Sequence, residues 1–378
     1  MRIGVPRETS PGERRVALVP ESGKKLIQAG YQVAIEAGAG SAAGFPDAAY
    51  REAGVTLDPS PVTVLGADLV LKVNRPESGE VAAMRPGSIY LGSLMPLRNL
   101  DTVRALATRG VTAFSTDAIP RTTRAQSMDT LSSMANISGY KGALLAATEL
   151  NKYFPMLMTA AGMVPPARVF VVGAAVAGLQ AIATARRLGA NVFATDVRPE
   201  VKEQIESVGA KYVGIELKEA ASAGGGYAKE LTKEDHVRQR ELLAAQCAQS
   251  DVVITTALIG GVFAPRLITA DMVKGMKPGA VIMDLAADGG GNCELSRPGE
   301  TVVVGGVTIV APLNLPTTMP LHASLLFSRN LTAFLLAFTK DKTFQLDFTD
   351  DIQQGAAITH DGEVKHARTR DALHKAGT

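Results

Sequence analysis

Short apolar runs alternate with candidate helices through the first 135 residues of the chain. The apolar runs predict strands at Arg2–Val5, Gln32–Glu36, 68–72, 88–91 and Thr112–Ser115. Helical patterns lie between them, for example over 21–29, where Gly30 ends the predicted helix. Strands that alternate with helices are typical of a doubly wound parallel sheet.

The same alternation returns in the second half of the chain. Further strands are predicted at 169–172, Asn191–Thr195, 251–255, 280–284 and 307–311. Between the two sets, 131–161 has helical periodicity with a candidate kink at Ser138-Gly139, and we expect this segment to link two domains. The last helical pattern, 321–338, is expected to pack back on the first domain, which makes that domain discontinuous.

The sequence from 169 to 198 reads VFVVGAAVAGLQAIATARRLGANVFATDVR and forms a strand, a small-residue turn, a helix and a second strand. Gly173 allows the tight turn, and Gly178 lets the helix pack closely on the strand. The N-terminus of the helix offers free N–H groups and a positive dipole end to a pyrophosphate. This arrangement predicts a dinucleotide site, although Ala175 replaces the middle glycine of the usual motif.

Asp196 stands at the end of the second strand of that motif. A carboxylate there accepts hydrogen bonds from the ribose hydroxyls of adenosine and repels a 2′-phosphate, so NAD(H) is favoured over NADP(H). Arg198 weakens this preference somewhat, because its positive charge follows closely. The prediction is an α/β protein with two Rossmann-like, doubly wound parallel-sheet domains and a nucleotide cleft between them. The first domain is expected to comprise 1–137 and 326–378, and the NAD(H)-binding domain 138–325.

Composition narrows the range of functions. Hydrophobic residues make up 46% and charged residues 20% of the 378 positions, as in ordinary globular proteins. The net charge of +2 argues against nucleic acid as a partner. The opening MRIGVPRE is expected to be a strand and not a signal peptide, and no apolar run approaches the roughly 20 residues that span a bilayer. We therefore expect a cytoplasmic chain, with Cys247 and Cys293 as buried apolar residues.

Two polar stretches stand apart from this pattern. The glycine-rich segment 218–235 is expected to be a mobile loop that acts as a lid, with a disordered insertion as the alternative. The tail, 340–378, is expected to form a hairpin or an extended arm. It holds His360, His366 and His374, but no cluster has metal-ligand spacing, so no metal is predicted.

Candidate chemistry lies at the expected ends of strands. The segment PRTTRAQSMD and the residue that follows it closely bring together four polar side chains, namely Arg121, Gln126, Asp129 and Ser132. These side chains suit a nicotinamide carboxamide, and the alternative is a helix N-cap with a solvated turn. Arg15 and Lys72 would bind a substrate carboxylate or form ordinary ion pairs. The run 283–294, with Asp284, Asp288 and three glycines, suits a close backbone approach to a ligand.

The histidines argue against a reduction that needs a proton donor. None occurs before His236 in the sequence. Reduction of a keto or imino acid needs an acid beside the hydride acceptor, and histidine is the usual choice. Hydride transfer between two nicotinamides moves no proton at the reacting carbons, so positioning alone can carry it.

Seven motifs along the whole chain together resemble one family. They are RIGVPRETSPGERRVALVP, RAQSMDTLSSMANISGY, GAAVAGLQAIATARRLGANVFATDVR, GGGYAKEL, TTALI, APRLI and DLAADGGGNCE. The chain resembles the NAD(H)-binding domain I of the proton-translocating, Si/Re-specific NAD(P)⁺ transhydrogenases, in the form of a separate alpha-1 subunit. Alanine dehydrogenase is similar in the same places and shares the fold.

The resemblance implies roles for individual residues. Arg121, Gln126 and Asp129 would serve hydride transfer, with Ser132 beside them holding the nicotinamide end. The remaining nucleotide contacts would come from Gly173, Val176, Ala177, Gly178, Asp196, Val197, Arg198, Gly226, Tyr227, Ala228, Gln239 and Leu258. Gly260-Gly261 departs from the proline-glycine pair that is frequent in the family.

The same resemblance implies an assembly. The chain would be a homodimer that holds NAD(H), with NADP(H) on a separate beta subunit and a third, membrane-spanning subunit that translocates protons. It would lie on the inner face of the cell membrane through these partners. The alternative function is an alanine dehydrogenase, whose carboxylate-binding pair Arg15 and Lys72 match and whose acidic active-site position Asp288 matches. That enzyme's essential histidine is expected within 90–95, where this chain reads YLGSLM.

Overall fold

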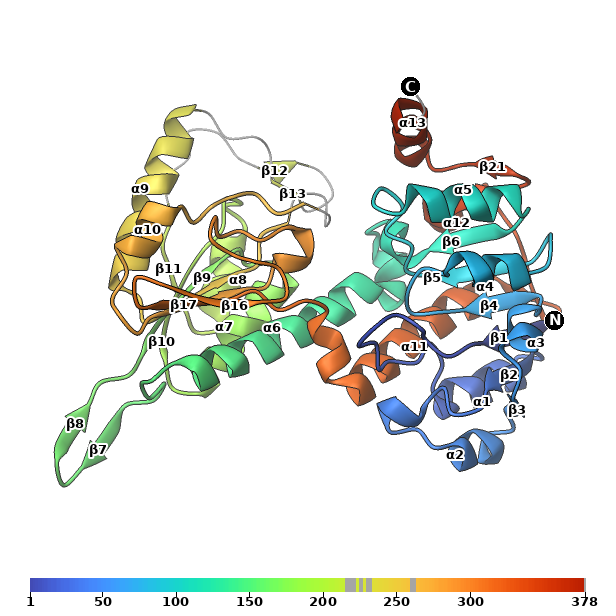
Figure 1. Cartoon of the computed structure of the whole chain (residues 1–378), viewed down its shortest axis with the longest axis horizontal. Helices are drawn as coiled ribbons and strands as arrows, with labels where there is room; N and C mark the ends of the chain where they lie inside the picture. Colours follow the sequence, from blue (N-terminus) through green and yellow to red (C-terminus); the bar gives the residue numbers. More distant parts are fainter. Residues whose placement is uncertain (215–221, 224–226, 229–232, 259–262, 377–378) are drawn as a thin grey trace. The chain divides into compact units, whose positions relative to one another are not determined.

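The computed structural model describes residues 1–214, 222–223, 227–228, 233–258 and 263–376 of the chain, which Figure 1 draws as a ribbon. The fold divides into two compact units. The first unit consists of Met1–Met134 and Pro316–Thr378, and the second of Ala135–Leu315. The chain therefore leaves the first unit once and returns to it with its last sixty or so residues.

The first unit alternates strands and helices up to residue 115 and ends with a mixed segment. Its strands are β1 (Arg2–Val5), β2 (Gln32–Glu36), β3 (Thr56–Asp58), β4 (Leu69–Leu71), β5 (Ile89–Gly92), β6 (Thr112–Ser115), β18 (Thr339–Lys340), β19 (Thr343–Phe344), β20 (Ala357–His360) and β21 (Glu363–Val364). Its helices are α1 (Pro20–Gln28), α2 (Asp47–Glu52), α3 (Pro61–Leu65), α4 (Ser78–Ala83), α5 (Leu100–Thr108), α11 (Pro320–Ala337), α12 (Asp351–Ala356) and α13 (Ala367–Ala376).

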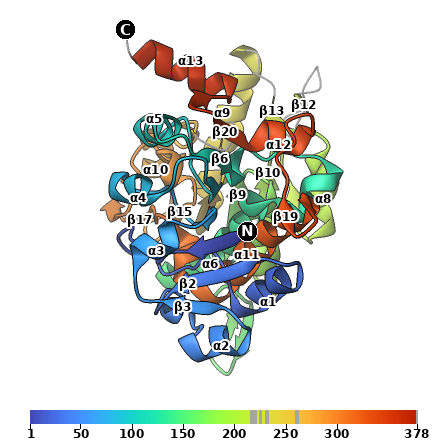
Figure 2. The ribbon, with the colours of Figure 1, turned by 90° about the vertical axis from the view of Figure 1, so that its right-hand side faces the viewer.

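The first sheet has the strand order β21-β20-β6-β5-β4-β1-β2-β3. The six strands from β3 to β6 are parallel and run in the order of a doubly wound fold, which reverses between β1 and β4. Because neighbouring residues of a strand face opposite sides, Leu69 and Leu71 join one core and Val70 the other. Helices α1, α11 and α12 cover the first face, and α3, α4 and α5 the second (Figure 2).

The second unit repeats this architecture. Its strands are β7 (Leu157–Thr159), β8 (Gly162–Val164), β9 (Arg168–Val172), β10 (Asn191–Thr195), β11 (Lys211–Tyr212), β12 (Ser222–Ala223), β13 (Tyr227–Ala228), β14 (Val252–Thr255), β15 (Val281–Asp284), β16 (Thr301–Val304) and β17 (Val307–Val310). Its helices are α7 (Val176–Arg187), α8 (Val201–Ser207), α9 (Lys233–Gln249) and α10 (Ala270–Lys274), and α6 (Thr130–Glu149) belongs to it from residue 135 onward.

The second sheet has the order β11-β10-β9-β14-β15-β17-β16, with only the edge strand β16 antiparallel among these. Helices α6, α7 and α8 pack on one face, and α9 and α10 on the other. The strand order again reverses beside the first strand, here between β9 and β14. Both sheets therefore confirm the predicted α/β fold class.

Two predictions about the connecting segments are wrong. The helix expected over 131–161 ends at Glu149, and residues 157–164 form the β7–β8 hairpin instead. The tail is more than an arm, because β20 pairs antiparallel with β6 and extends the first sheet. Thr359 secures this pairing, since its buried hydroxyl donates to the carbonyl oxygen of Val111 at 2.7 Å.

Gly139 explains how α6 packs within the second unit. A Cβ atom at this position would lie 2.1 Å from the carbonyl oxygen of Ala177, in the first turn of α7. Real Cβ atoms do not approach an oxygen this closely, so only glycine lets the two helices meet here. The dipeptide Ser138-Gly139 therefore serves close packing, whereas the sequence pattern had indicated a kink.

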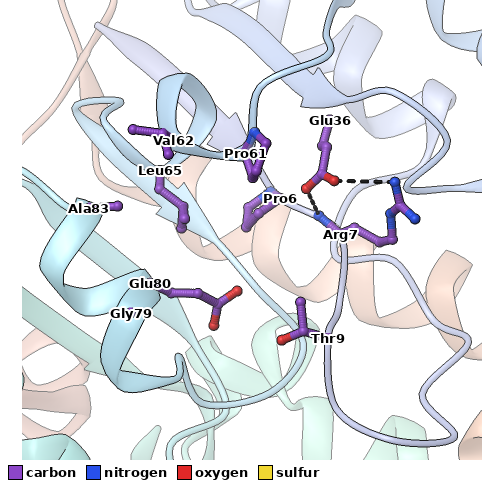
Figure 3. A pocket seen from close by; sticks show the side chains of 10 residues that line it. All are labelled: Pro6, Arg7, Thr9, Glu36, Pro61, Val62, Leu65, Gly79, Glu80 and Ala83. Atoms are coloured by element: carbon purple, nitrogen blue, oxygen red, sulfur yellow. Dashed lines mark hydrogen bonds and ion pairs between the residues drawn. The ribbon is translucent and has the colours of Figure 1, made fainter.

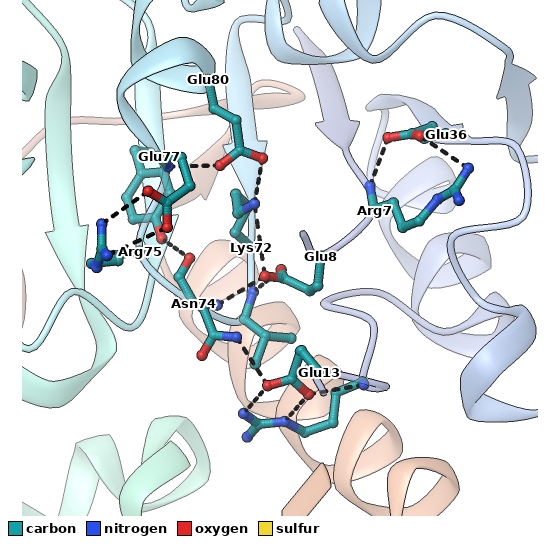
Figure 4. A network of polar contacts seen from close by, with 12 residues as sticks. Arg7, Glu8, Glu13, Glu36, Lys72, Asn74, Arg75, Glu77 and Glu80 are labelled. Carbon is teal, nitrogen blue, oxygen red and sulfur yellow. Dashed lines mark hydrogen bonds and ion pairs between the residues drawn. The ribbon is translucent and has the colours of Figure 1, made fainter. Parts of the chain in front are cut away.

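A buried polar network closes the first sheet at its reversal point, where the carboxyl ends of β1 and β4 meet (Figure 4). The Glu8 carboxylate accepts the N–H of Val73 at 2.6 Å and lies 3.7 Å from the Lys72 ammonium. Lys72 is 1% exposed and also pairs with Glu80 at 2.6 Å. Burial raises the pKa of Glu8 to about 7, although the charge of Lys72 opposes this shift.

A second carboxylate completes the network. Glu13 is fully buried, and its two oxygens receive a bidentate pair from the Arg15 guanidinium at 2.7 and 2.6 Å. The side-chain amide of Asn74 donates to the same carboxylate at 2.9 Å. Burial by itself raises the pKa of Glu13, but the bonds and charge of Arg15 outweigh it and hold that pKa well below its usual range.

We expect the substitution Glu8→Gln to remove a pH dependence of stability. The pKa of Glu8 rises from 4.5 to about 7 on folding, so its stabilising contribution is complete below pH 4.5 and is lost as the pH rises through 7. The linked free energy is about 3 kcal/mol. Urea denaturation between pH 5 and pH 8 should therefore show Glu8→Gln gaining stability relative to the wild type as the pH rises.

The control for this measurement is Glu52→Gln, which makes the same change at an exposed position of α2. Its stability should stay parallel to the wild type throughout this pH range. A constant difference between Glu8→Gln and the wild type would show that Glu8 does not titrate in the folded chain near neutral pH.

Candidate functional site

The turn after β9 has the geometry that the dinucleotide motif predicts. Gly173 has a φ of +94°, a conformation that strongly favours glycine. Its N–H donates to the carbonyl oxygen of Thr195 at 2.9 Å, which ties the turn to the end of β10. The Thr256 hydroxyl donates to the Gly173 carbonyl oxygen at 3.0 Å, so the residue after β14 holds the turn from the other side.

Helix α7 begins immediately after this turn. Gly178 is buried in its first turn, and a Cβ atom there would lie 1.9 Å from the Gly173 carbonyl oxygen. Ala175 is the N-cap and makes no side-chain cap hydrogen bond. Val176 is exposed and Ala177 half-buried, so the N-terminal turn lies at the surface of this unit. An N-terminus of this kind binds the phosphates of a dinucleotide through its N–H groups and its dipole.

The backbone explains how Ala175 is accommodated in the motif. Its φ of −76° and ψ of −166° are extended values that any residue adopts. The alanine therefore imposes no strain, and its exposed methyl group is the only change relative to glycine. Ala175 alters the space in front of the turn and not the turn itself.

Asp196 follows β10 and is held at the same turn. Its Oδ2 accepts the N–H of Ala174 at 2.8 Å, and its Oδ1 accepts the backbone N–H and the Nε of Arg198 at 3.0 and 2.9 Å. The side chain of Asp196 is 7% exposed and that of Arg198 15%. The carboxylate is thus fixed beside the turn, but an adjacent guanidinium balances its charge.

Asp284 differs from its predicted role. It is fully buried at the end of β15, and its carboxylate accepts hydrogen bonds from Thr255, Ala286, Asn292, Cys293 and Ser296. These five donors use its lone pairs, so Asp284 fixes the loop after β15 and does not face a ligand. Asp288 is exposed, and its carboxylate accepts the backbone N–H of Asn314 at 3.2 Å.

The other residues predicted in the second unit are placed less specifically. Val197 is half-buried beside Asp196, and Leu258 is 38% exposed in the segment after β14. Gln239 is half-buried on α9, which covers the opposite face of the sheet from α7. Tyr227 and Ala228 form β13, which pairs with β12, whereas Gly226 and Gly260-Gly261 lie outside the described residues.

The polar segment after β6 forms a turn of 3₁₀ helix over Thr123–Met128 in the first unit. Ala125 and Met128 are buried, so this short helix is anchored by residues three positions apart on one face. Gln126 lies on the exposed side, and so does Arg121 just before the helix. The exposed polar residues thus stand on a fixed backbone.

Asp129 and Ser132 are brought together, as the sequence predicts. Asp129 Oδ1 accepts the N–H of Ser132 at 2.8 Å, and Oδ2 accepts its hydroxyl at 2.6 Å. A carboxylate that binds the N–H three residues later is an N-cap, so this pair begins helix α6. The alternative considered from the sequence, a helix cap, is therefore present for these two residues.

Sequence reasoning missed two residues that hold this segment. The Asn330 side-chain amide on α11 donates to the carbonyl oxygen of Ser127 at 2.7 Å. Arg124 pairs with Asp350, the N-cap of α12, at 2.6 Å and also with Asp351. Both contacts join segments more than 200 positions apart, and no local pattern announces them.

The carboxylate-binding pair expected for an alanine dehydrogenase is engaged within the first unit. Arg15 binds Glu13, and Lys72 binds Glu80 and lies near Glu8. In the segment 90–95, the N–H groups of Leu94 and Met95 donate to the Asp117 carboxylate at 2.8 and 2.7 Å. No histidine occurs in that segment.

Histidine in this unit is found at the opposite end of the sheet. His360 on β20 contacts Thr112 at 3.0 Å, at the start of β6 and not at its carboxyl end. Across the described residues no group of three His, Cys, Asp or Glu side chains would hold a metal ion. Cys247 and Cys293 are buried and unbridged. No described helix has the length and apolar character needed to cross a membrane.

Family models cover nearly the whole chain. The model described as "Alanine dehydrogenase/PNT, N-terminal domain" matches residues 4–138, and "Alanine dehydrogenase/PNT, C-terminal domain" matches residues 142–367. Both segments of the chain are therefore matched by the two halves of one family.

Individual relatives agree with this assignment. The first of the chains that make up the NAD(P) transhydrogenase subunit alpha of Rhodospirillum rubrum is 47% identical over 376 residues, which cover 97% of this chain and 98% of that one. A crystal structure of a transhydrogenase from Sinorhizobium meliloti has a TM-score of 0.88 at 44% identity, covering 96% of this chain and 100% of the other. An alanine dehydrogenase of Halomonas elongata is 30% identical over 382 residues, 99% of this chain and 97% of that one.

These matches confirm the resemblance found in the sequence motifs. The chain belongs to the alanine dehydrogenase/PNT family.

Proposed function

We propose that this chain is the NAD(H)-binding subunit of a proton-translocating transhydrogenase. In the proposed reaction, NADH binds here and its C4 hydride passes directly to C4 of NADP⁺ on a separate subunit. The products are NAD⁺ and NADPH, and no proton is gained or lost at the reacting carbons. A third, membrane-spanning subunit would couple this transfer to proton movement.

The observation that carries this proposal is the Gly173 turn with α7 behind it and Asp196 beside it. The Ala174 N–H bond to Asp196, at 2.8 Å, places the carboxylate where the ribose hydroxyls of a bound adenosine would lie. The pyrophosphate would bind the N–H groups of Val176 and Ala177 at the start of α7. Leu258, Val197, Gln239 and the segment around Tyr227 are proposed as further contacts.

The preference for NAD(H) depends on the charge at the end of β10. Asp196 is paired with Arg198 at 2.9 Å, so the pair as a whole is close to neutral. Discrimination against a 2′-phosphate then comes from the carboxylate's position at the ribose and not from a net negative field. The ribose hydroxyls would displace part of the Arg198 contact to reach Asp196.

Gln126, Arg121 and Asp129 are proposed to serve hydride transfer through position alone. The amide of Gln126 matches the hydrogen-bonding groups of the nicotinamide carboxamide, and Asp129 with Ser132 fixes the end of the segment. Reactions between two fixed carbons depend steeply on their separation and angle. The buried anchors Ala125 and Met128 supply the required rigidity.

An alanine dehydrogenase function is less well supported. Reduction of an imino acid needs a general acid, typically worth roughly 10²–10⁴-fold in rate. The segment 90–95 offers backbone N–H groups bound to Asp117 and no histidine. Identity to the alanine dehydrogenase is 30%, against 47% to the transhydrogenase subunit.

The proposed assembly includes a second copy of this chain. The β7–β8 hairpin pairs Met158 directly with Met163, and these side chains are 72% and 61% exposed. A two-stranded ribbon is only marginally stable by itself in water, so a partner surface would stabilise it. We propose that the hairpin binds another copy and that the dimer lies on the inner face of the membrane through the NADP(H)-binding and membrane-spanning subunits.

The substitution Gln126→Asn tests the proposed reaction and the positioning role together. Shortening the side chain by one methylene should slow hydride transfer by about 10²-fold, because the carboxamide is held out of line. NADH affinity should change less than about threefold, since most of the binding contacts lie elsewhere. Stopped-flow absorbance with the NADP(H)-binding subunit gives the rate, and fluorescence titration gives the affinity.

Gln354→Asn is the matched control, since Gln354 is exposed on α12. It should leave both the rate and the affinity unchanged. An equal loss of rate and affinity in Gln126→Asn would contradict the positioning role. Absence of hydride transfer by the wild type with its partner, together with alanine-dependent reduction of NAD⁺, would contradict the proposed function.

Replacing both hairpin methionines by threonine should weaken the proposed dimer. The change Met158→Thr with Met163→Thr keeps residues that favour strands but removes the exposed apolar pair. Analytical ultracentrifugation should show the dissociation constant rising at least tenfold. Val303→Thr makes a comparable change at a 67% exposed position on the edge strand β16 and should leave the association intact. Equal association of both variants would exclude the hairpin as the interface.

A further inference from the structure

The first unit repeats the nucleotide-binding geometry of the second in one detail. In the first sheet Val5 pairs with Ile35 and the next residue on β2 is Glu36. In the second sheet Val172 pairs with Thr195 and the next residue is Asp196. Each acid therefore stands at the equivalent end of the second strand, beside the carboxyl end of the first.

The same hydrogen bond holds the two acids. The Arg7 N–H donates to Glu36 Oε2 at 2.8 Å, and the Ala174 N–H donates to Asp196 Oδ2 at 2.8 Å. Arg7 and Ala174 each lie two residues beyond the last residue of the first strand. A guanidinium flanks each carboxylate, since Arg7 lies 3.3 Å from Glu36 and Arg198 lies 2.9 Å from Asp196.

The two units differ where the phosphates would bind. In the second unit α7 starts four residues after β9, whereas in the first unit α1 starts only at Pro20, after a long loop. The Glu8 carboxylate takes up the Val73 N–H at the reversal point of the first sheet. An anion there meets buried carboxylates in place of free helix N–H groups, so this end of the first sheet disfavours phosphate.

A pocket of about 450 Å³ opens beside Glu36 (Figure 3). Its apolar wall comes from Pro61, Val62 and Leu65 of α3, and Val62 is 64% exposed. Glu36 and Arg7 stand at one side of the pocket and Glu80 at another (Figure 3). This volume is within the range of small-ligand sites, which combine an apolar wall with a few polar groups.

We propose that this pocket binds a nucleoside that carries no phosphate. The ribose diol would donate to Glu36, as it would to Asp196 in the second unit, and the flat base would lie against Pro61 and Val62. The absence of a helix N-terminus after β1 and the nearby Glu80 select an uncharged ligand over a nucleotide. The site lies within the first unit and does not depend on hydride transfer.

Adenosine is the probe, added to the full-length chain already saturated with NADH so that the adenosine subsite of the second unit is filled. Equilibrium dialysis with labelled adenosine should show one further equivalent bound per chain. Adenosine 5′-monophosphate and 2′-deoxyadenosine should each bind at least tenfold more weakly, because one brings charge and the other lacks half of the diol. No binding of adenosine in the presence of NADH would overturn the proposal.

Glu36→Gln should reduce adenosine binding at least tenfold and leave NADH binding unchanged. Glu52→Gln, on the exposed side of α2, should leave both unchanged. Equal adenosine binding by Glu36→Gln and the wild type would refute the site, even if the variant's melting temperature matches the wild type. Failure of NADH itself to bind would contradict the proposed function, and adenosine binding that Glu36→Gln still abolishes would leave this inference standing.

Discussion

The close approach of α7 to the turn before it is the constraint on which the second unit depends. A Cβ at Gly178 would come within 1.9 Å of the Gly173 carbonyl oxygen, and one at Gly139 within 2.1 Å of Ala177. Two glycines therefore let α7 meet both the strand β9 and the helix α6. The resulting position of α7 leaves its N-terminal turn at the surface, which is the condition for binding a phosphate.

The two sheets show how one architecture is used differently at the same edge. Both reverse their strand order beside the first strand, where doubly wound folds bind ligands. The second unit leaves this edge to a short turn and a helix N-terminus. The first unit fills it with the carboxylates of Glu8 and Glu13, which Lys72 and Arg15 neutralise. Burial of paired charges gives a fixed and specific crevice, at a cost in desolvation that the hydrogen bonds offset.

Most strands of both sheets could be predicted because their apolar runs are local. The bounds of β1, β2, β6 and β10 agree with the sequence prediction. Strand β3 was missed because it has only three residues and none of them is buried. Strand β20 was missed because it gains its place by pairing with β6, about 240 positions earlier in the chain.

The candidate site divides in the same way. The turn at Gly173 and the pairing of Asp129 with Ser132 are local, so residue spacing indicated both. Asn330 and Arg124 act across the chain, and only the fold shows that they hold the segment around Gln126. Asp284 looked like a ligand-facing acid in the sequence, because its five donors come together only in the folded loop.

The central claim is that the second unit binds NAD(H) through the turn at Gly173 and the carboxylate of Asp196. Fluorescence titration of the purified chain with NADH and with NADPH tests it most directly. The account predicts that NADH binds at least tenfold more tightly and that Asp196→Asn removes most of this difference. Equal affinity of the wild type for the two nucleotides would contradict the account.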